Sequence, residues 1–102
     1  MKSKKLFKKV LEGNFKSIMD GGFWNYDRFG FGEVEGKCYR VELEGYGDDR
    51  DVFELKEGLS IDGIIKEGVE KKFFEIVEDD IFYEEELEEE MMDWIFSLEG
   101  MN

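Results

Sequence analysis

The sequence predicts an α+β fold: an N-terminal helix, then a small antiparallel β-sheet, with one or two C-terminal helices packed on it. Two changes in hydrophobic spacing indicate this order, because the spacing is helical towards both ends of the chain and alternating in the middle. The 102 residues contain no proline and no Ser/Gly linker, which favours one continuous domain over residues 1–102.

The first predicted element is a helix, and its apolar residues recur at helical spacing at Leu6, Phe7, Val10 and Leu11. Ser3 is its expected N-cap, and Gly13-Asn14 is its expected end. The next apolar residues, Phe15, Ile18 and Met19, are expected to add a short further turn before Gly21-Gly22.

The middle of the chain predicts antiparallel strands. In residues 37–45 an apolar set, Tyr39, Val41 and Leu43, alternates with a polar set, Cys38, Arg40, Glu42 and Glu44, as in a half-buried strand. Residues 45–49 have turn chemistry, and residues 52–55 can return as the partner strand. Residues 23–35 are expected to add another strand or two.

The C-terminal half predicts helices again. Ser60 or Asp62 can cap a segment with one apolar face, formed by Ile61, Ile64, Ile65, Val69, Phe73, Ile76 and Val77. Gly63 and Gly68 lower its helix propensity, which leaves a strand over 69–77 as the alternative. The last predicted element is an amphipathic helix of about four turns, ended by Gly100 and anchored by Tyr83, Leu87, Met91, Trp94, Ile95 and Leu98.

Several functional classes are not expected. The chain has no histidine and a single cysteine, Cys38, which is interpreted as a structural thiol, so we expect no enzyme and no cofactor. Its acids Asp48, Asp49, Asp51 and Glu54 lack EF-hand spacing, so no metal site is predicted. Lys8-Lys9 interrupts the only N-terminal apolar stretch and no apolar run is long enough to span a membrane, so we expect a cytoplasmic protein.

The charge is distributed unevenly. The net charge is −13, and residues 78–102 contribute −11 of it without one basic residue, whereas residues 1–16 carry +5. The predicted partner-binding residues are the acids of this C-terminal part: Glu78, Asp79, Asp80, Glu84, Glu85, Glu86, Glu88, Glu89, Glu90 and Asp93. On one helix the seven acids of residues 84–93 would approach the charge density of duplex DNA, about one charge per 1.7 Å, and Glu78, Asp79 and Asp80 extend this acidic band. We therefore expect a partner protein with a basic, nucleic-acid-binding surface, and no direct contact with nucleic acid or membrane.

In size, charge and lack of catalytic groups, with the acidic stretch 78–93, the chain resembles the small acidic inhibitors that phages and mobile elements carry against host defences, such as anti-CRISPR and anti-restriction proteins. The resemblance implies an inhibitor that mimics nucleic acid. It rests on general character and no shared motif, so no residue roles are carried over from those families.

Three alternatives remain open at this level. The acidic stretch can be a solvated face, or can be neutralised internally by the lysine-rich first helix. A second candidate surface contains Trp24, Tyr26 and Arg28, residue types common at interface hot spots, which would suit an immunity or adaptor protein that recognises its partner by shape. The third alternative is a homodimer that pairs the basic first helix with the acidic last helix of a neighbour.

Overall fold

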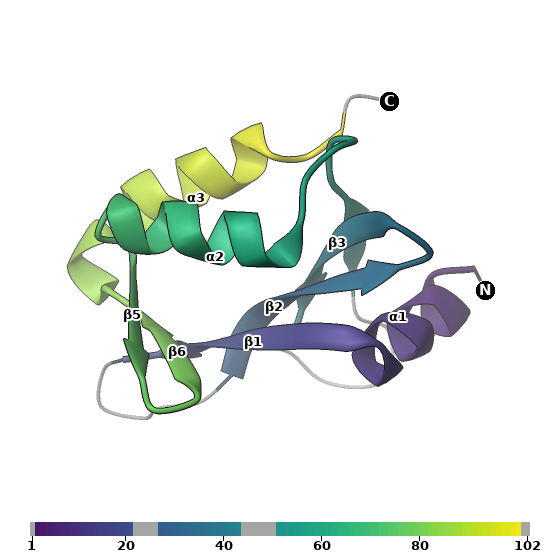
Figure 1. Ribbon diagram of the computed structural model, residues 1–102, viewed down its shortest axis with the longest axis horizontal. Coiled ribbons are helices and arrows are strands. Elements are labelled where there is room, and N and C mark those ends of the chain that lie inside the picture. The colour runs from purple at the N-terminus through teal and green to yellow at the C-terminus, as the bar shows by residue number, and fades with distance from the viewer. Residues whose placement is uncertain (1, 22–26, 44–50, 101–102) are drawn as a thin grey trace.

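The computed structural model describes residues 2–21, 27–43 and 51–100, and shows the predicted α+β architecture (Figure 1). The elements in chain order are α1 (Lys2–Glu12), β1 (Asn14–Asp20), β2 (Asp27–Val34), β3 (Lys37–Glu42), β4 (Val52–Glu54), α2 (Ile61–Glu70), β5 (Phe74–Val77), β6 (Asp80–Tyr83), the 3₁₀ helix η1 (Glu85–Leu87) and α3 (Glu88–Ser97). The strands form one six-stranded sheet in the order β4-β3-β2-β1-β6-β5. Neighbouring strands are antiparallel except β1 and β6, which are parallel.

Both faces of the sheet carry helices. On one face α2 and α3 lie side by side over a core that includes Ile18, Phe31, Met91 and Ile95 (Figure 1). On the other face α1 packs through Val10 against a smaller cluster of strand residues. Within the described part of the chain, no helix is long and apolar enough to cross a membrane.

The segment Phe29-Gly30-Phe31-Gly32 of β2 shows why helices can pack on both faces of the sheet. Both phenylalanines point into the core under α2 and α3, and alternation turns the two glycines towards α1. A Cβ atom on Gly32 would lie 2.2 Å from Val10 Cγ1, and one on Gly30 would lie 2.3 Å from Phe15 Cζ. Because glycine has no side chain, Val10 of α1 can pack directly on Gly32, and the Phe15 ring can pack directly on Gly30.

β3 has two buried faces, whereas the sequence predicted one buried and one solvated face. Tyr39 and Val41 face α1 as expected, but Cys38 and Arg40 are buried on the opposite face. The Arg40 guanidinium lies 4.3 Å from the Phe53 ring centroid and contacts Glu42 and Glu99 at 3.0 and 3.3 Å. Alternation could not reveal this burial, because the residues that cover Arg40 come from distant parts of the chain.

Several other element boundaries differ from those predicted. Helix α1 begins at Lys2, one residue before the expected cap at Ser3. Residues 15–19 belong to strand β1 rather than to a helical turn, since they hydrogen-bond β2 on one side and β6 on the other. Residues 23–35 contain one described strand, β2, and the expected turn over 45–49 lies outside the described residues, which resume at 51.

The segment 61–77 combines both structures that the sequence allowed. Ser60 is the N-cap of α2, and its hydroxyl accepts a hydrogen bond from the Gly63 amide at 3.1 Å. The helix ends at Glu70, and residues 74–77 form strand β5. Gly68 lowers helix propensity but leaves room for Phe74, whose ring would lie 2.2 Å from a Cβ atom at that position.

Candidate functional site

The predicted partner-binding acids lie on several elements rather than on one helix. Glu78 and Asp79 form the β5–β6 turn, Asp80 begins β6, Glu85 and Glu86 belong to η1, and only Glu88, Glu89, Glu90 and Asp93 lie in α3. The predicted four-turn helix that starts at Tyr83 is therefore wrong over residues 83–87, and the α-helix begins at Glu88. Residues 80–83 pair with β5 on one side, and residues 81–83 pair with β1 on the other. This two-sided pairing outweighs the helical spacing of Tyr83, Leu87 and Met91.

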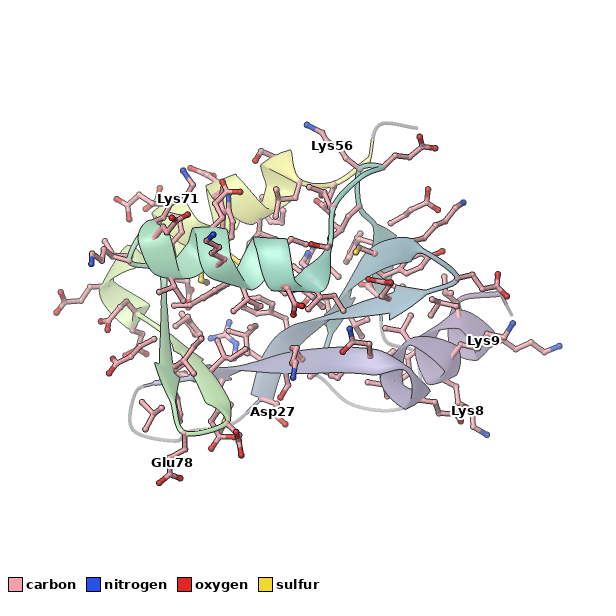
Figure 2. The ribbon with its side chains drawn as sticks, in the orientation of Figure 1. Lys8, Lys9, Asp27, Lys56, Lys71 and Glu78 are labelled. Carbon is pink, nitrogen blue, oxygen red and sulfur yellow. The ribbon has the colours of Figure 1, made fainter. Side chains whose placement is uncertain are left out.

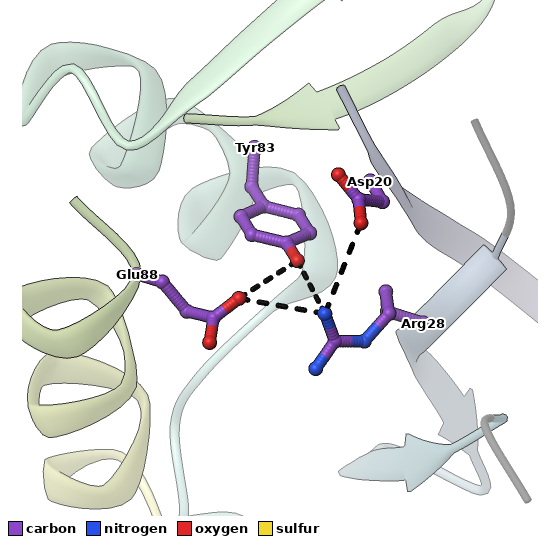
Figure 3. A network of polar contacts seen from close by, with 4 residues as sticks. All are labelled: Asp20, Arg28, Tyr83 and Glu88. Carbon is purple, nitrogen blue, oxygen red and sulfur yellow. Dashed lines mark hydrogen bonds and ion pairs between the residues drawn. The ribbon is translucent and has the colours of Figure 1, made fainter. Parts of the chain in front are cut away.

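Glu88 belongs to an internal polar network at the start of α3 (Figure 3). The Tyr83 hydroxyl donates a hydrogen bond to Glu88 Oε1 at 2.8 Å, and Arg28 Nη1 donates to the Tyr83 oxygen at 2.6 Å. Arg28 Nη1 also lies 3.4 Å from Glu88 Oε1 and 4.0 Å from Asp20 Oδ2. The Glu88 carboxylate thus has partners within the protein while its side chain stays 42% exposed, and its role at a partner surface stays a prediction.

Arg28 enters this network through an irregularity in the sheet. Ile18 pairs with Phe29 while Met19 pairs with Asp27, so Arg28 is the extra residue of a β-bulge. Its guanidinium has partners in the network, and the hot-spot role of Arg28 stays a prediction. Trp24 and Tyr26, the other residues of that predicted surface, lie outside the described residues.

The network raises the pKa of Tyr83 above its ordinary value. Burial is the largest cause, since it disfavours the phenolate, and the hydrogen bond to Glu88 adds to it. The positive charge of Arg28 acts in the opposite direction but is outweighed. Tyr83 therefore remains a protonated donor at neutral pH, and it holds Glu88 against β6.

Nine of the ten predicted acids are solvent-exposed and in no described ion pair. Six of these lie within residues 84–93, and we call these six the unpaired acids: Glu84, Glu85, Glu86, Glu89, Glu90 and Asp93. Among the described residues no ion pair joins any of them to a lysine or arginine. Trp94 fixes α3 beneath them, because its ring packs on Phe73 and Phe74 and its Nε1 donates to Glu67 at 2.9 Å. The charges are therefore carried by a packed element.

Part of this acidic region borders a depression of about 500 Å³, which we call the acidic hollow. It is lined by Gly21, Glu75, Phe82, Tyr83, Glu84, Glu85 and Glu86. Glu75 and Phe82 were not among the predicted surface residues. No local signal marks them, because Ile81, Phe82 and Tyr83 are all apolar and their alternation in burial appears only in the fold.

The basic residues of α1 do not neutralise this region. Helix α1 packs on the sheet face opposite to α2 and α3, and Lys5, Lys8 and Lys9 are exposed. In Figure 2, Lys8 and Lys9 lie at the end of the molecule away from the β5–β6 turn with Glu78. The hypothesis that the lysine-rich helix packs beside the acidic helix is therefore wrong for the described part of the chain.

Other candidate chemistry is structural in character. Cys38 is buried, its Sγ lies 3.0 Å from the Leu59 carbonyl oxygen, and burial, with a smaller effect of Glu33, raises the pKa of its thiol. The described residues contain no group of three or more His, Cys, Asp or Glu side chains that could hold a metal ion. Asp48 and Asp49, considered for calcium, lie outside them.

No protein-family model matches the chain, and comparisons with curated proteins and with solved structures gave no match either.

Proposed function

We propose that this chain is an acidic binding protein that acts in the cytoplasm and occupies a basic, nucleic-acid-binding surface of a partner protein. The observation that carries the proposal is the set of unpaired acids. Six exposed carboxylates lie within ten residues, on a 3₁₀ helix and the helix that follows it, with no described cation beside them.

The arrangement has an energetic cost that a cationic partner would relieve. Glu89 and Asp93 are four residues apart in α3, and such like-charge pairs destabilise a helix by about 0.2–0.5 kcal/mol each. The helix dipole compensates only the acids of the first turn, here Glu88, Glu89 and Glu90. A partner that supplies lysine or arginine side chains removes the remaining repulsion and releases counterions on both surfaces.

The structure changes the form that nucleic-acid mimicry can take. The unpaired acids occupy one short turn and one short helix, so they can replace a few phosphates rather than a long stretch of duplex. Such a surface suits a partner whose basic residues are clustered in one patch. Because the basic and acidic residues lie apart, a homodimer in which α1 of one molecule contacts α3 of another is the alternative to be tested.

The test compares two variants with the same change in net charge. One reverses Glu85, Glu86, Glu89 and Glu90 to lysine, and the control reverses Glu12, Glu35, Asp51 and Glu57, exposed acids outside the C-terminal acidic stretch. Each variant and the native chain serve as bait for proteins of the host lysate, and a DNA duplex is then added as competitor. We expect the first variant alone to lose its partner, and the duplex to displace the partner from the native chain.

Equal recovery by both variants would show that net charge or shape, rather than the unpaired acids, controls binding. Displacement should also become easier as salt is raised, since charge contacts are screened. Sedimentation of the native chain at low and high salt tests the dimer, and a monomer under both conditions removes that alternative.

A further inference from the structure

The two edge strands of the sheet, β4 and β5, differ in whether another segment of the chain pairs with them. Beyond β4 the C-terminal segment continues the pairing: Lys56 N donates to Leu98 O at 2.8 Å, and Gly100 N donates to Glu54 O at 2.9 Å. Beyond β5, at the other edge, no described residue pairs with the sheet. One edge is thus covered by the chain itself, and within the described residues the other is open.

The register of the β5–β6 hairpin determines which backbone groups face outward. Glu84 N donates to Phe73 O at 3.0 Å, which fixes the ladder so that Glu75 and Val77 direct their N–H and C=O groups towards β6. By the alternation of an antiparallel ladder, Phe74 and Ile76 direct theirs away from β6. At the open edge, the N–H and C=O groups of these two residues are therefore oriented to hydrogen-bond an added strand.

The edge strand β5 is short, with four residues, and carries the charge of Glu75, but its tip is apolar. Natural edge strands are guarded by short length, charged side chains, proline or bulges. Here Ile76 is 53% exposed and Val77 is 47% exposed, and together they form an apolar tip on the hairpin. Exposed neighbouring apolar residues on an unpaired strand are the features on which strand addition depends.

A depression lies on either side of β5. On the α2 side is a depression of about 520 Å³, here the apolar hollow, whose apolar lining is Ile65, Val69, Ile76 and Ile81. On the other side is the acidic hollow, to which Glu75 contributes. Since neighbouring residues of a strand point to opposite faces, a strand added beside β5 would direct alternate side chains to the two sides.

We infer that the open edge of β5 binds an extended segment of the partner protein as an added β-strand, with apolar side chains on the α2 side and lysine or arginine side chains on the acidic side. This inference rests on the proposed acidic-binding function and names the mode of recognition. Charge decides the occupant, because Glu75 and the neighbouring Glu84, Glu85 and Glu86 favour a basic segment. A second copy of this chain would instead bring another net charge of −13 to the same edge.

The first test uses two synthetic peptides of one composition. The probe is the acetylated and amidated peptide Lys-Val-Lys-Val-Lys-Val-Lys, and its isomer Lys-Lys-Val-Val-Val-Lys-Lys lacks the alternation. Fluorescence anisotropy at low salt should show the alternating peptide binding about tenfold more tightly than the isomer, because only it places both residue types on their matching sides.

The second test removes one outward donor. Ile76→Pro deletes the N–H that points away from β6, a position at which an edge strand tolerates proline. Ile76→Val is the matched control, since it keeps both the donor and an apolar side chain. We expect Ile76→Pro to weaken the alternating peptide about tenfold and Ile76→Val to leave it nearly unchanged. Thermal unfolding of both variants checks that the hairpin is retained.

A third measurement needs no variant. On binding the alternating peptide, the native amides of Phe74 and Ile76 should become protected from hydrogen exchange, while those of Glu75 and Val77 are already paired and should change little. Equal binding of the two peptides, without this protection, overturns strand addition but leaves the acidic-binding function standing. Absence of binding by either peptide, or unchanged binding to Ile76→Pro, also overturns the inference.

Discussion

The Tyr83 hydroxyl donates to Glu88 Oε1 at 2.8 Å, and this bond joins the last residue of β6 to the first residue of α3. Arg28 approaches both groups from the bulge in β2, so three separate elements meet at one point (Figure 3). The network positions the start of α3, and with it the unpaired acids that follow Glu88. Its integrity is therefore a condition for the proposed surface.

Tyr83→Phe is expected to lower the free energy of unfolding by about 2 kcal/mol, because a buried hydrogen bond to a charged acceptor is lost while the ring is retained. Urea denaturation measures the change. Tyr39→Phe is the matched control, since its ring is also buried in the sheet and no hydrogen bond joins its hydroxyl to a described residue. Equal losses in the two variants would contradict a specific role for the Tyr83–Glu88 bond.

The raised pKa of Tyr83 predicts a dependence of stability on alkaline pH. In the unfolded chain this tyrosine ionises near its ordinary pKa of about 10, whereas in the folded protein it stays protonated to higher pH. The stabilisation is therefore complete below about pH 10 and is lost as pH rises above it, at no more than about 1.4 kcal/mol per pH unit. The difference in unfolding free energy between the native chain and Tyr83→Phe should shrink over that range.

Ultraviolet titration supplies a direct check on this order of ionisation. The titration of the native protein should contain an ionisation at high pH that is absent from the titration of Tyr83→Phe. Loss of an ionisation near the ordinary tyrosine pKa in Tyr83→Phe would contradict the assignment.

Arg40→Met is expected to destabilise the protein by about 1.5–3 kcal/mol, because it removes the charge-assisted hydrogen bonds from Arg40 to Glu42 and Glu99. Lys37→Met is the control on the same strand. Its Nζ lies 3.9 Å from Glu54, and both side chains are more than half exposed, so the loss should stay below about 0.5 kcal/mol. Guanidinium denaturation of the two variants gives the comparison, and similar losses would show that Arg40 acts as a surface residue.

Gly32→Ala is expected to destabilise by about 1–3 kcal/mol, since the added methyl group would overlap Val10 Cγ1. Val10→Ala alone removes buried apolar surface and is also destabilising. In the double variant the new methyl group occupies space that the smaller residue at position 10 has vacated. The combined loss should therefore be smaller than the sum of the single losses, and simple additivity would contradict the close approach of α1 to β2.

Asp93→Lys is expected to stabilise the protein by about 0.5–1 kcal/mol while it weakens partner binding. The change removes the repulsion between Glu89 and Asp93 and places a lysine four residues after a glutamate, the favourable orientation in a helix. The gain should diminish in high salt. Thermal unfolding at two salt concentrations measures stability, and a gain in stability with unchanged binding would remove Asp93 from the partner surface.

Local spacing by itself determined the helices and hairpins that depend on near neighbours in the chain. The 3.6-residue spacing of Leu6 and Val10 predicted α1, and the alternation of Tyr39 and Val41 predicted β3 with its partner β4. The Ser60 cap was predictable because a cap satisfies backbone amides only three residues away. The acidic character of the C-terminal quarter also followed from composition alone.

Tertiary structure decided the secondary structure of those residues for which non-local strand pairing competes with local helix preference. Tyr83 fits a helical pattern with Leu87 and Met91, yet it lies in a strand because β1 and β5 flank it and satisfy the backbone groups of β6. Arg28 and Glu88, 60 residues apart, meet in a part-buried network that their separation in the sequence does not reveal. The open edge of β5 likewise depends on the order of all six strands, and no local pattern contains that order. The sequence thus determined how acidic this protein is, and the fold decided which acids remain free to bind.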